Sequence, residues 1–130
     1  RDEHYGSLDD AEKLRSSLRR TMWGQVGVIR SGESLIRACA QLSRWSQLVA
    51  QPFSQRGALE VKNMVQVAQC VAEAALWREN SIGAHYRADF PQAKRPGWQQ
   101  HSRLSMGEGI SGTAPRKSRG LLLALKGRAG

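Results

Sequence analysis

The apolar pattern of residues 58–80 constrains the fold of this chain more than any other feature. Along this segment, ALEVKNMVQVAQCVAEAALWREN, apolar side chains recur at helical spacing and cover more than half of the predicted helix's circumference. They are Val61, Met64, Val65, Val67, Ala68, Val71, Ala72, Ala74 and Ala75. So wide an apolar surface predicts contacts on two sides, and the alanines let neighbouring helices approach closely.

Two further segments each carry one apolar stripe. Residues 7–23 predict a first helix, with Ser7 as N-cap and acidic residues in the first turn, where the helix dipole favours them. Residues 31–51 predict a second helix that begins after Ser31 and ends before Pro52. Its stripe contains Leu35, Ala38, Cys39, Leu42, Trp45 and Val49. Short connections between three helices predict an all-α, up-down-up three-helix bundle, and no strand pattern is long enough to predict a sheet.

The chain of 130 residues is long enough for one domain. We expect the bundle and a C-terminal docking loop in residues 7–91, an extension anchored by Trp98 in residues 92–105, and a basic, disordered tail in residues 106–130. A bundle of roughly eighty residues is only marginally stable alone, so we expect another domain to complete one face. The opening, RDEHYGS, has no initiator methionine and no leader, which suggests a piece cut from a longer polypeptide.

The positive charge is concentrated at one end of the chain. Residues 1–91 hold 12 Lys and Arg against 10 Asp and Glu, whereas residues 92–130 hold 8 against 1. A nucleic-acid reader usually gathers its basic residues on a structured face, so this distribution argues against a nucleic-acid partner for the body. The alternative function is a small basic helical module that binds nucleic acid or another acidic partner through residues 92–130. A stand-alone helical adaptor is a third possibility.

Cysteine usage and hydropathy indicate the cellular compartment in which we expect the protein. Cys39 and Cys70 lie in helical patterns without metal-ligand spacing, so we interpret them as small buried hydrophobes, which fits a reducing cytoplasm. No stretch approaches the ~18 apolar residues of a membrane helix, so we expect a cytoplasmic protein without a membrane partner.

The densest group of chemically versatile side chains is the run LWRENSIGAHYRADFP, residues 76–91. If residues 85–90 are extended, His85, Arg87 and Asp89 share one side, and Tyr86 and Phe90 pack under them on the other. We place Gly83 near the position after a helix C-cap. Arg78 either caps its own helix or pairs with a partner.

Direct chemistry is a weaker interpretation of this run. His85 oriented by Asp89 would suit an acid or base, but no nucleophile or second carboxylate lies nearby, and Ser81 has no oxyanion donors. A metal would need a third ligand, and His4 and His101 are distant in sequence. We interpret the segment GEGISG as a poor phosphate loop because it follows no predicted strand and precedes no predicted helix. We therefore predict no catalytic, metal or cofactor-binding residue. The candidates for interdomain or loop-fixing contacts are Arg78, His85, Tyr86, Arg87 and Asp89.

The order of these motifs resembles the C-terminal helical domain of the L-aspartate oxidases, within the succinate dehydrogenase and fumarate reductase flavoprotein family. The resemblance covers approximately residues 12–101. It rests on MW..VGVIR at residues 22–30, Asn63, AAL.R at residues 74–78, and S.GAHYRADFP at residues 81–91. At the last motif Asn80 replaces an acid of the family pattern and Ile82 replaces an arginine, so a charge pair is lost or replaced by apolar packing.

The resemblance implies a function for the parent enzyme more than for this chain. Such an enzyme oxidises L-aspartate to iminoaspartate, passing a hydride to FAD, as the first step toward quinolinate and NAD, and fumarate or oxygen reoxidises the flavin. The flavin fold and the substrate-binding residues belong to the larger N-terminal portion. For this chain the resemblance implies no cofactor of its own and one partner, the FAD-binding domain of the same enzyme.

Overall fold

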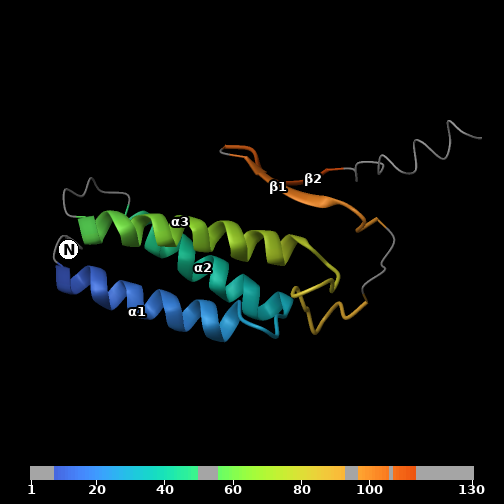
Figure 1. Ribbon diagram of the computed structural model, residues 1–130, viewed down its shortest axis with the longest axis horizontal. Coiled ribbons are helices and arrows are strands. Elements are labelled where there is room, and N and C mark those ends of the chain that lie inside the picture. The colour runs from blue at the N-terminus through green and yellow to red at the C-terminus, as the bar shows by residue number, and fades with distance from the viewer. Residues whose placement is uncertain (1–7, 50–55, 93–96, 106, 114–130) are drawn as a thin grey trace, which may run out of the picture.

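A computed structural model describes residues 8–49, 56–92, 97–105 and 107–113. Three helices form a bundle in which consecutive helices run in opposite directions, as the sequence predicts (Figure 1). They are α1 (Leu8–Gln25), α2 (Gly32–Leu48) and α3 (Arg56–Trp77). All three pairs of helices are in contact. Among the described residues, no helix is long and apolar enough to cross a membrane.

The helix ends follow local sequence signals. The Ser31 hydroxyl accepts a hydrogen bond from the Ser34 backbone N–H at 3.2 Å, and the Ser34 hydroxyl accepts one from Ser31 N–H at 3.1 Å, so a capping box starts α2. In the connection from α1 to α2, a Cβ at Gly27 would lie 2.2 Å from the carbonyl oxygen of Trp23, so only glycine fits. Ser7 and Pro52, which we expected to bound helices, lie outside the described residues.

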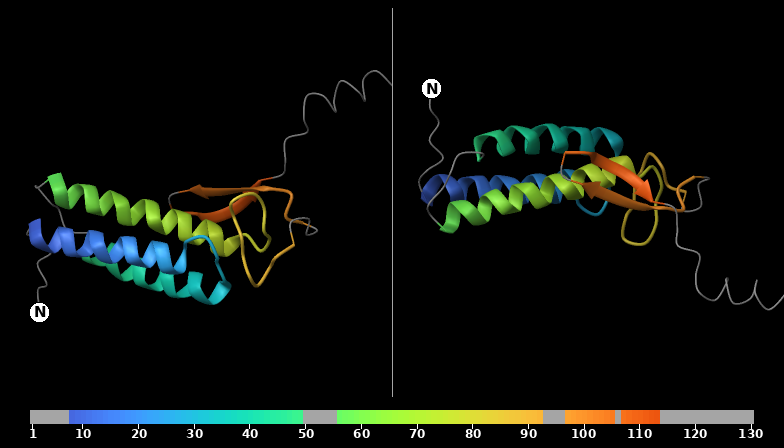
Figure 2. Two further views of the ribbon diagram at one scale, coloured as in Figure 1. Left: turned by 60° about the horizontal axis from the view of Figure 1, so that its bottom comes forward. Right: turned by 90° about the horizontal axis from the view of Figure 1, so that it is seen from above.

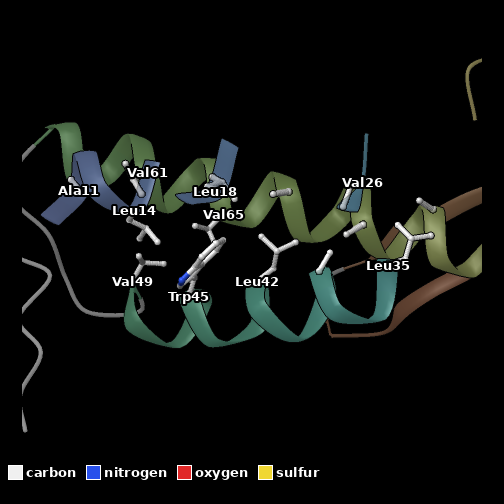
Figure 3. Packing of buried hydrophobic residues seen from close by; sticks show 14 residues of the cluster. Ala11, Leu14, Leu18, Val26, Leu35, Leu42, Trp45, Val49, Val61 and Val65 are labelled. Carbon is white, nitrogen blue, oxygen red and sulfur yellow. The ribbon is translucent and has the colours of Figure 1, made fainter. Parts of the chain in front are cut away.

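The core is one apolar layer between the three helices (Figure 3). The predicted stripe of α2 is confirmed, with Cys39 only partly buried at its edge. On α3 the buried positions recur at helical spacing and are Ala58, Val61, Val65, Ala68, Ala72 and Ala75. The other side of the apolar surface is less covered, because Val67 is 62% exposed and Val71 is 41% exposed. These two side chains border an apolar hollow of about 460 Å³ between α1 and α3.

The prediction of a purely helical chain is wrong in one respect. Strands β1 (His101–Ser105) and β2 (Gly109–Thr113) form an antiparallel hairpin, and both strands contact α3 (Figure 2). In the connecting turn Gly107 and Gly109 have φ of 80° and 72°, and Glu108 N–H donates to the Ser105 carbonyl. The strands are mostly exposed on both faces, so they lack the apolar alternation that predicts a sheet.

The hairpin also changes the expected boundary of the tail. Residues 107–113, which we expected to belong to a disordered tail, form a turn and a strand instead. The segment GEGISG makes the turn and part of β2, and our expectation that no strand precedes it is wrong, because β1 ends at Ser105. The remainder of the expected tail, residues 114–130, lies outside the described residues.

Candidate functional site

The candidate site is the junction loop, defined as residues 78–92, which follows α3 at one end of the bundle. There it meets the α1–α2 connection, and the views of Figures 1 and 2 agree on this placement. Arg30 N–H donates to the Tyr86 carbonyl at 3.1 Å, and Ala88 N–H donates to the Arg30 carbonyl at 2.7 Å. This short parallel pairing ties the junction loop to a segment more than fifty residues earlier in the chain.

Arg87 lies at the centre of the junction loop and is 2% exposed. Its guanidinium donates to the carbonyl oxygens of Leu76 at 2.6 Å and Arg78 at 3.3 Å. The last carbonyls of a helix have no intrahelical donor, so Arg87 supplies donors where α3 ends. The Phe90 ring stacks on the same guanidinium, with 4.8 Å between the Arg87 Cζ atom and the ring centroid.

Asp89 connects Arg87 to the start of α2. Its carboxylate accepts hydrogen bonds from Arg87 Nε at 3.0 Å, Arg87 Nη2 at 2.6 Å and the Gly32 backbone N–H at 2.9 Å. Gly32 opens α2, where the helix dipole favours a negative charge. The hydrogen bonds from Arg87, and then that from Gly32, lower the pKa of Asp89. A Cβ at Gly32 would lie 2.8 Å from Asp89 Oδ2, so glycine lets the carboxylate reach the backbone.

His85 bridges the two loops as a neutral imidazole. Its Nδ1 lies 2.8 Å from Arg30 Nη1, and its Nε2 lies 3.2 Å from the Arg78 carbonyl oxygen. A guanidinium only donates, so Nδ1 accepts and Nε2–H donates. Burial lowers the pKa of His85 most, and the positive charges of Arg30, Arg78 and Arg87 lower it further, against the hydrogen bond to the Arg78 carbonyl.

Arg78 joins the end of α3 to the extension. Its guanidinium donates to the carbonyl oxygens of Trp98, at 3.2 Å, and Gln100. It also lies over the ring of Trp77, and that ring meets Trp98 edge to face with 4.8 Å between the centroids. Arg78 and Trp98 therefore fix the segment that leads into β1.

Two small residues shape the junction loop. The buried Ser81 hydroxyl donates to the Phe90 carbonyl at 2.8 Å and accepts from Arg87 N–H at 3.0 Å. Gly83 has φ of 57° in a tight turn whose ends, Ile82 and His85, exchange backbone hydrogen bonds of 2.8 and 3.0 Å. Our placement of Gly83 just after a helix C-cap is therefore wrong. The helix ends at Trp77, before the predicted Asn80, and Gly83 serves the turn.

The two sides of residues 85–90 are not arranged as we expected. The polar side faces inward, because the carbonyls at the end of α3 and the N–H at the start of α2 need partners. Tyr86 is 43% exposed and Ile82 is 57% exposed, so neither packs deeply against the bundle. Arg30, Gly32 and Ser81 complete the network, and our list of candidates omitted them. Arg30 ends the VGVIR motif and Ser81 begins the S.GAHYRADFP motif, whereas Gly32 belongs to neither motif.

Several large apolar side chains are exposed at the end of α1, in the α1–α2 connection and in the junction loop. Trp23 is 79% exposed, Val28 is 74% exposed and Ile29 is 70% exposed. Ile29 and Tyr86 directly precede the paired residues Arg30 and Arg87, so they lie on one side of that pairing. We call the exposed set the apolar rim, which consists of Trp23, Val28, Ile29, Ile82 and Tyr86. Exposed apolar groups gathered in one region are typical of interaction surfaces.

The junction does not fit the phosphates of a flavin dinucleotide. Such phosphates bind at a helix N-terminus whose backbone N–H groups are open to them. At α2 the Ser31 hydroxyl and the Asp89 carboxylate already accept hydrogen bonds from Ser34 and Gly32. Within the described ranges, no three His, Cys, Asp or Glu side chains form a group that could hold a metal ion.

Comparisons with known proteins identify the family. The family model described as the fumarate reductase flavoprotein C-terminal region matches residues 15–114. The chain belongs to this family. The residues that match this family model include most of α1, all of α2 and α3, the junction loop and the hairpin. The hairpin is thus inside the family unit, and the match ends just after it.

Similar proteins are several times longer than this chain. The L-aspartate oxidase of Synechocystis sp. is 36% identical over 68% of this chain and 20% of its own length. A CoM/CoB fumarate reductase polypeptide of Methanothermobacter marburgensis is 38% identical over 73% of this chain and 19% of its own length. In fold, the Mycobacterium smegmatis Sdh1 complex in the apo form matches with a TM-score of 0.65 and 24% identity, over 83% of this chain and 20% of that chain. The chain therefore spans about a fifth of the length of the relatives that it matches.

Proposed function

We propose that this chain is the C-terminal helical domain of an L-aspartate oxidase-like flavoenzyme, that it packs on the FAD-binding domain, and that it is not catalytic alone. The proposed parent oxidises L-aspartate to iminoaspartate with FAD, in the cytoplasm, as a step of NAD biosynthesis. The family and the L-aspartate oxidases among its relatives support this function. The free cysteines Cys39 and Cys70 agree with a reducing compartment.

One observation supports the docking role. At the junction the polar side chains bond within this chain, whereas large apolar side chains are exposed. Arg78, His85, Arg87 and Asp89 bond to this chain's own backbone and to one another. We therefore infer that these four side chains hold the junction loop in place and do not bond directly to another domain. Tyr86 differs from them because it belongs to the apolar rim, and we assign it a docking contact.

The apolar rim continues along α1 toward the apolar hollow. Trp23 in the rim directly follows Met22, which lines the hollow together with Leu18 of α1 and Met64 and Val67 of α3. The exposed apolar surface thus extends from the end of the bundle to its α1–α3 side. Covering it with the flavin domain would bury side chains worth about 1.5–3 kcal/mol each. Such coverage would give α3 further apolar contacts, as the width of its apolar surface predicts.

A chimera tests the docking role. Residues 15–114 of this chain replace the matching C-terminal segment of the Synechocystis L-aspartate oxidase, and bound flavin per protein is measured by absorbance after gel filtration. Ile29→Glu places a charge in the rim, and we expect it to lower flavin retention at least about tenfold. Leu59→Glu is the matched control, since Leu59 is 42% exposed near the opposite end of α3. Equal flavin retention in both variants would contradict docking through the rim.

A further inference from the structure

A second surface, separate from the apolar rim, lies between α1 and α2. It is a groove with a volume of about 500 Å³. From α1 it receives Ser17, Arg20, Thr21 and Gln25, and from α2 it receives Arg37 and Arg44. No carboxylate lines it, although the folded part of the chain is otherwise nearly balanced in charge. Three guanidinium groups on one groove make a local positive potential that attracts anions.

The present partners of these arginines are weak. Arg20 Nη2 lies 3.4 Å from the Ser17 hydroxyl, and Arg44 bonds to the amide of Gln41. Arg37 pairs with Glu33 at 3.1 Å, but the two side chains are 61% and 81% exposed. Exposed pairs of this kind contribute little to stability, so the guanidinium groups can turn toward a ligand at small cost.

A second, independent observation comes from Gln25. Its Oε1 atom is buried and accepts no hydrogen bond from the described residues. A buried acceptor without a donor is unfavourable, and the side chain lines the same groove. Carboxylate or phosphate oxygens of an occupant suit the arginines, and rotation of the Gln25 side chain into the groove brings Oε1 to a donor of the same occupant.

The spacing of the arginines favours an extended occupant. Arg37 and Arg44 are seven residues apart on α2, which corresponds to about 10.5 Å along the helix axis. The small side chain of Ala40 lies between them and lets another chain approach closely. Guanidinium groups spaced along the groove can each pair with a separate anionic group of an occupant that lies along it. A peptide can carry such groups, and its backbone N–H groups supply the donor.

We propose that the α1–α2 groove binds an acidic segment of a partner protein. Two carboxylates of that segment, about 10.5 Å apart as Arg37 and Arg44 are along α2, pair with these arginines, and a backbone N–H of the segment bonds to Gln25 Oε1. Arg20 contacts the same segment from the α1 side. This surface goes beyond the proposed function, because docking on the flavin domain uses the apolar rim.

The test uses the full chain and a synthetic, non-helical peptide with two glutamates three residues apart, which an extended chain places about 10 Å apart. Its control peptide carries glutamines at these positions, and binding is measured by isothermal titration calorimetry at low salt. We expect the triple variant Arg20→Gln, Arg37→Gln and Arg44→Gln to bind the glutamate peptide at least about tenfold more weakly than the unaltered chain. The variant Arg116→Gln, Arg119→Gln and Arg128→Gln loses the same charge from the tail and should stay within about threefold.

Gln25→Leu leaves every charge in place and should weaken binding about fivefold, through the lost acceptor. Unchanged affinity in this variant would overturn the placement of the peptide in the groove. Equal losses in the two triple variants, or a loss only in the tail variant, would overturn the proposal in favour of non-specific attraction or the tail. Pyrophosphate that binds as tightly as the peptide and displaces it would also overturn it, in favour of a small-anion site.

Discussion

Replacing Arg87 by alanine is the most informative perturbation of the junction. Arg87 is 2% exposed, and its guanidinium makes four hydrogen bonds, two to Asp89 and one each to the carbonyls of Leu76 and Arg78. The alanine variant removes all four. It leaves the Asp89 carboxylate without its cation and removes the Arg87 donors from the carbonyls of Leu76 and Arg78, although the Arg78 carbonyl keeps a donor from His85.

The size of the effect follows from burial. Removing one partner of a fully buried ion pair costs about 3–5 kcal/mol. The Asp89 side chain is 35% exposed, so water compensates part of this loss. We therefore expect the free energy of unfolding to fall by about 2–4 kcal/mol, which lowers the melting temperature of a domain of this size by at least about 8 °C.

Urea and thermal unfolding of the full chain, followed by far-UV circular dichroism, measure this effect. Arg87→Lys keeps the charge but cannot make the same set of bonds, so we expect a loss of about 1–2 kcal/mol. Arg56→Ala is the control, because Arg56 is 94% exposed in its pair with Glu60 and should change stability by less than about 0.5 kcal/mol. An Arg87→Ala variant as stable as Arg56→Ala would refute the reasoning.

Three further predictions concern the turn, the histidine and the core. Gly83→Ala forces a side chain into a residue with φ of 57° and should lower the free energy of unfolding by about 1–2 kcal/mol in urea titrations, whereas a loss below about 0.3 kcal/mol would contradict the assigned turn. The pKa of His85 is lowered in the folded chain, so the unfolded chain binds more protons near pH 6. The stabilisation that His85 provides is therefore complete above about pH 6.5 and lost as the pH falls below it, and His85→Gln should flatten urea midpoints between about pH 7 and 5. Leu42→Ala empties a site that is 0% exposed and should cost about 2–5 kcal/mol by the same measurement, and a smaller loss would show that the core is not closed there.

The helices and their packing faces could be predicted from the sequence because these features are local. The stripe from Leu35 to Val49 repeats at helical spacing, and Ser31 marks the start of α2. The partners in the junction could not be predicted in this way. His85 and Arg30 are 55 positions apart, and Asp89 and Gly32 are 57 positions apart. Only the folded bundle brings the end of α3 and the start of α2 close enough for one Arg–Asp pair to serve both.

The hairpin and the inward direction of Arg87 also could not be predicted from local sequence patterns. The hairpin has one apolar cross-strand pair, Leu104 and Ile110, and its other positions are mostly small or polar. Glycine at positions 107 and 109 was the available signal, and it indicates a turn without showing that strands flank it. The inward direction of Arg87 was likewise hidden, because an alternating pattern does not show which of its two sides is buried.

Anaerobic reduction of flavin by L-aspartate in the chimera tests the central claim most directly. In that protein, residues 15–114 replace the C-terminal segment of the Synechocystis relative, and the flavin absorbance is followed after L-aspartate is added. Our account predicts bleaching of the flavin in the chimera, and no bleaching in a truncated protein that lacks this segment. A chimera that binds flavin but does not bleach with L-aspartate, or a truncated protein that bleaches equally well, would contradict the claim that this chain completes an L-aspartate oxidase-like enzyme.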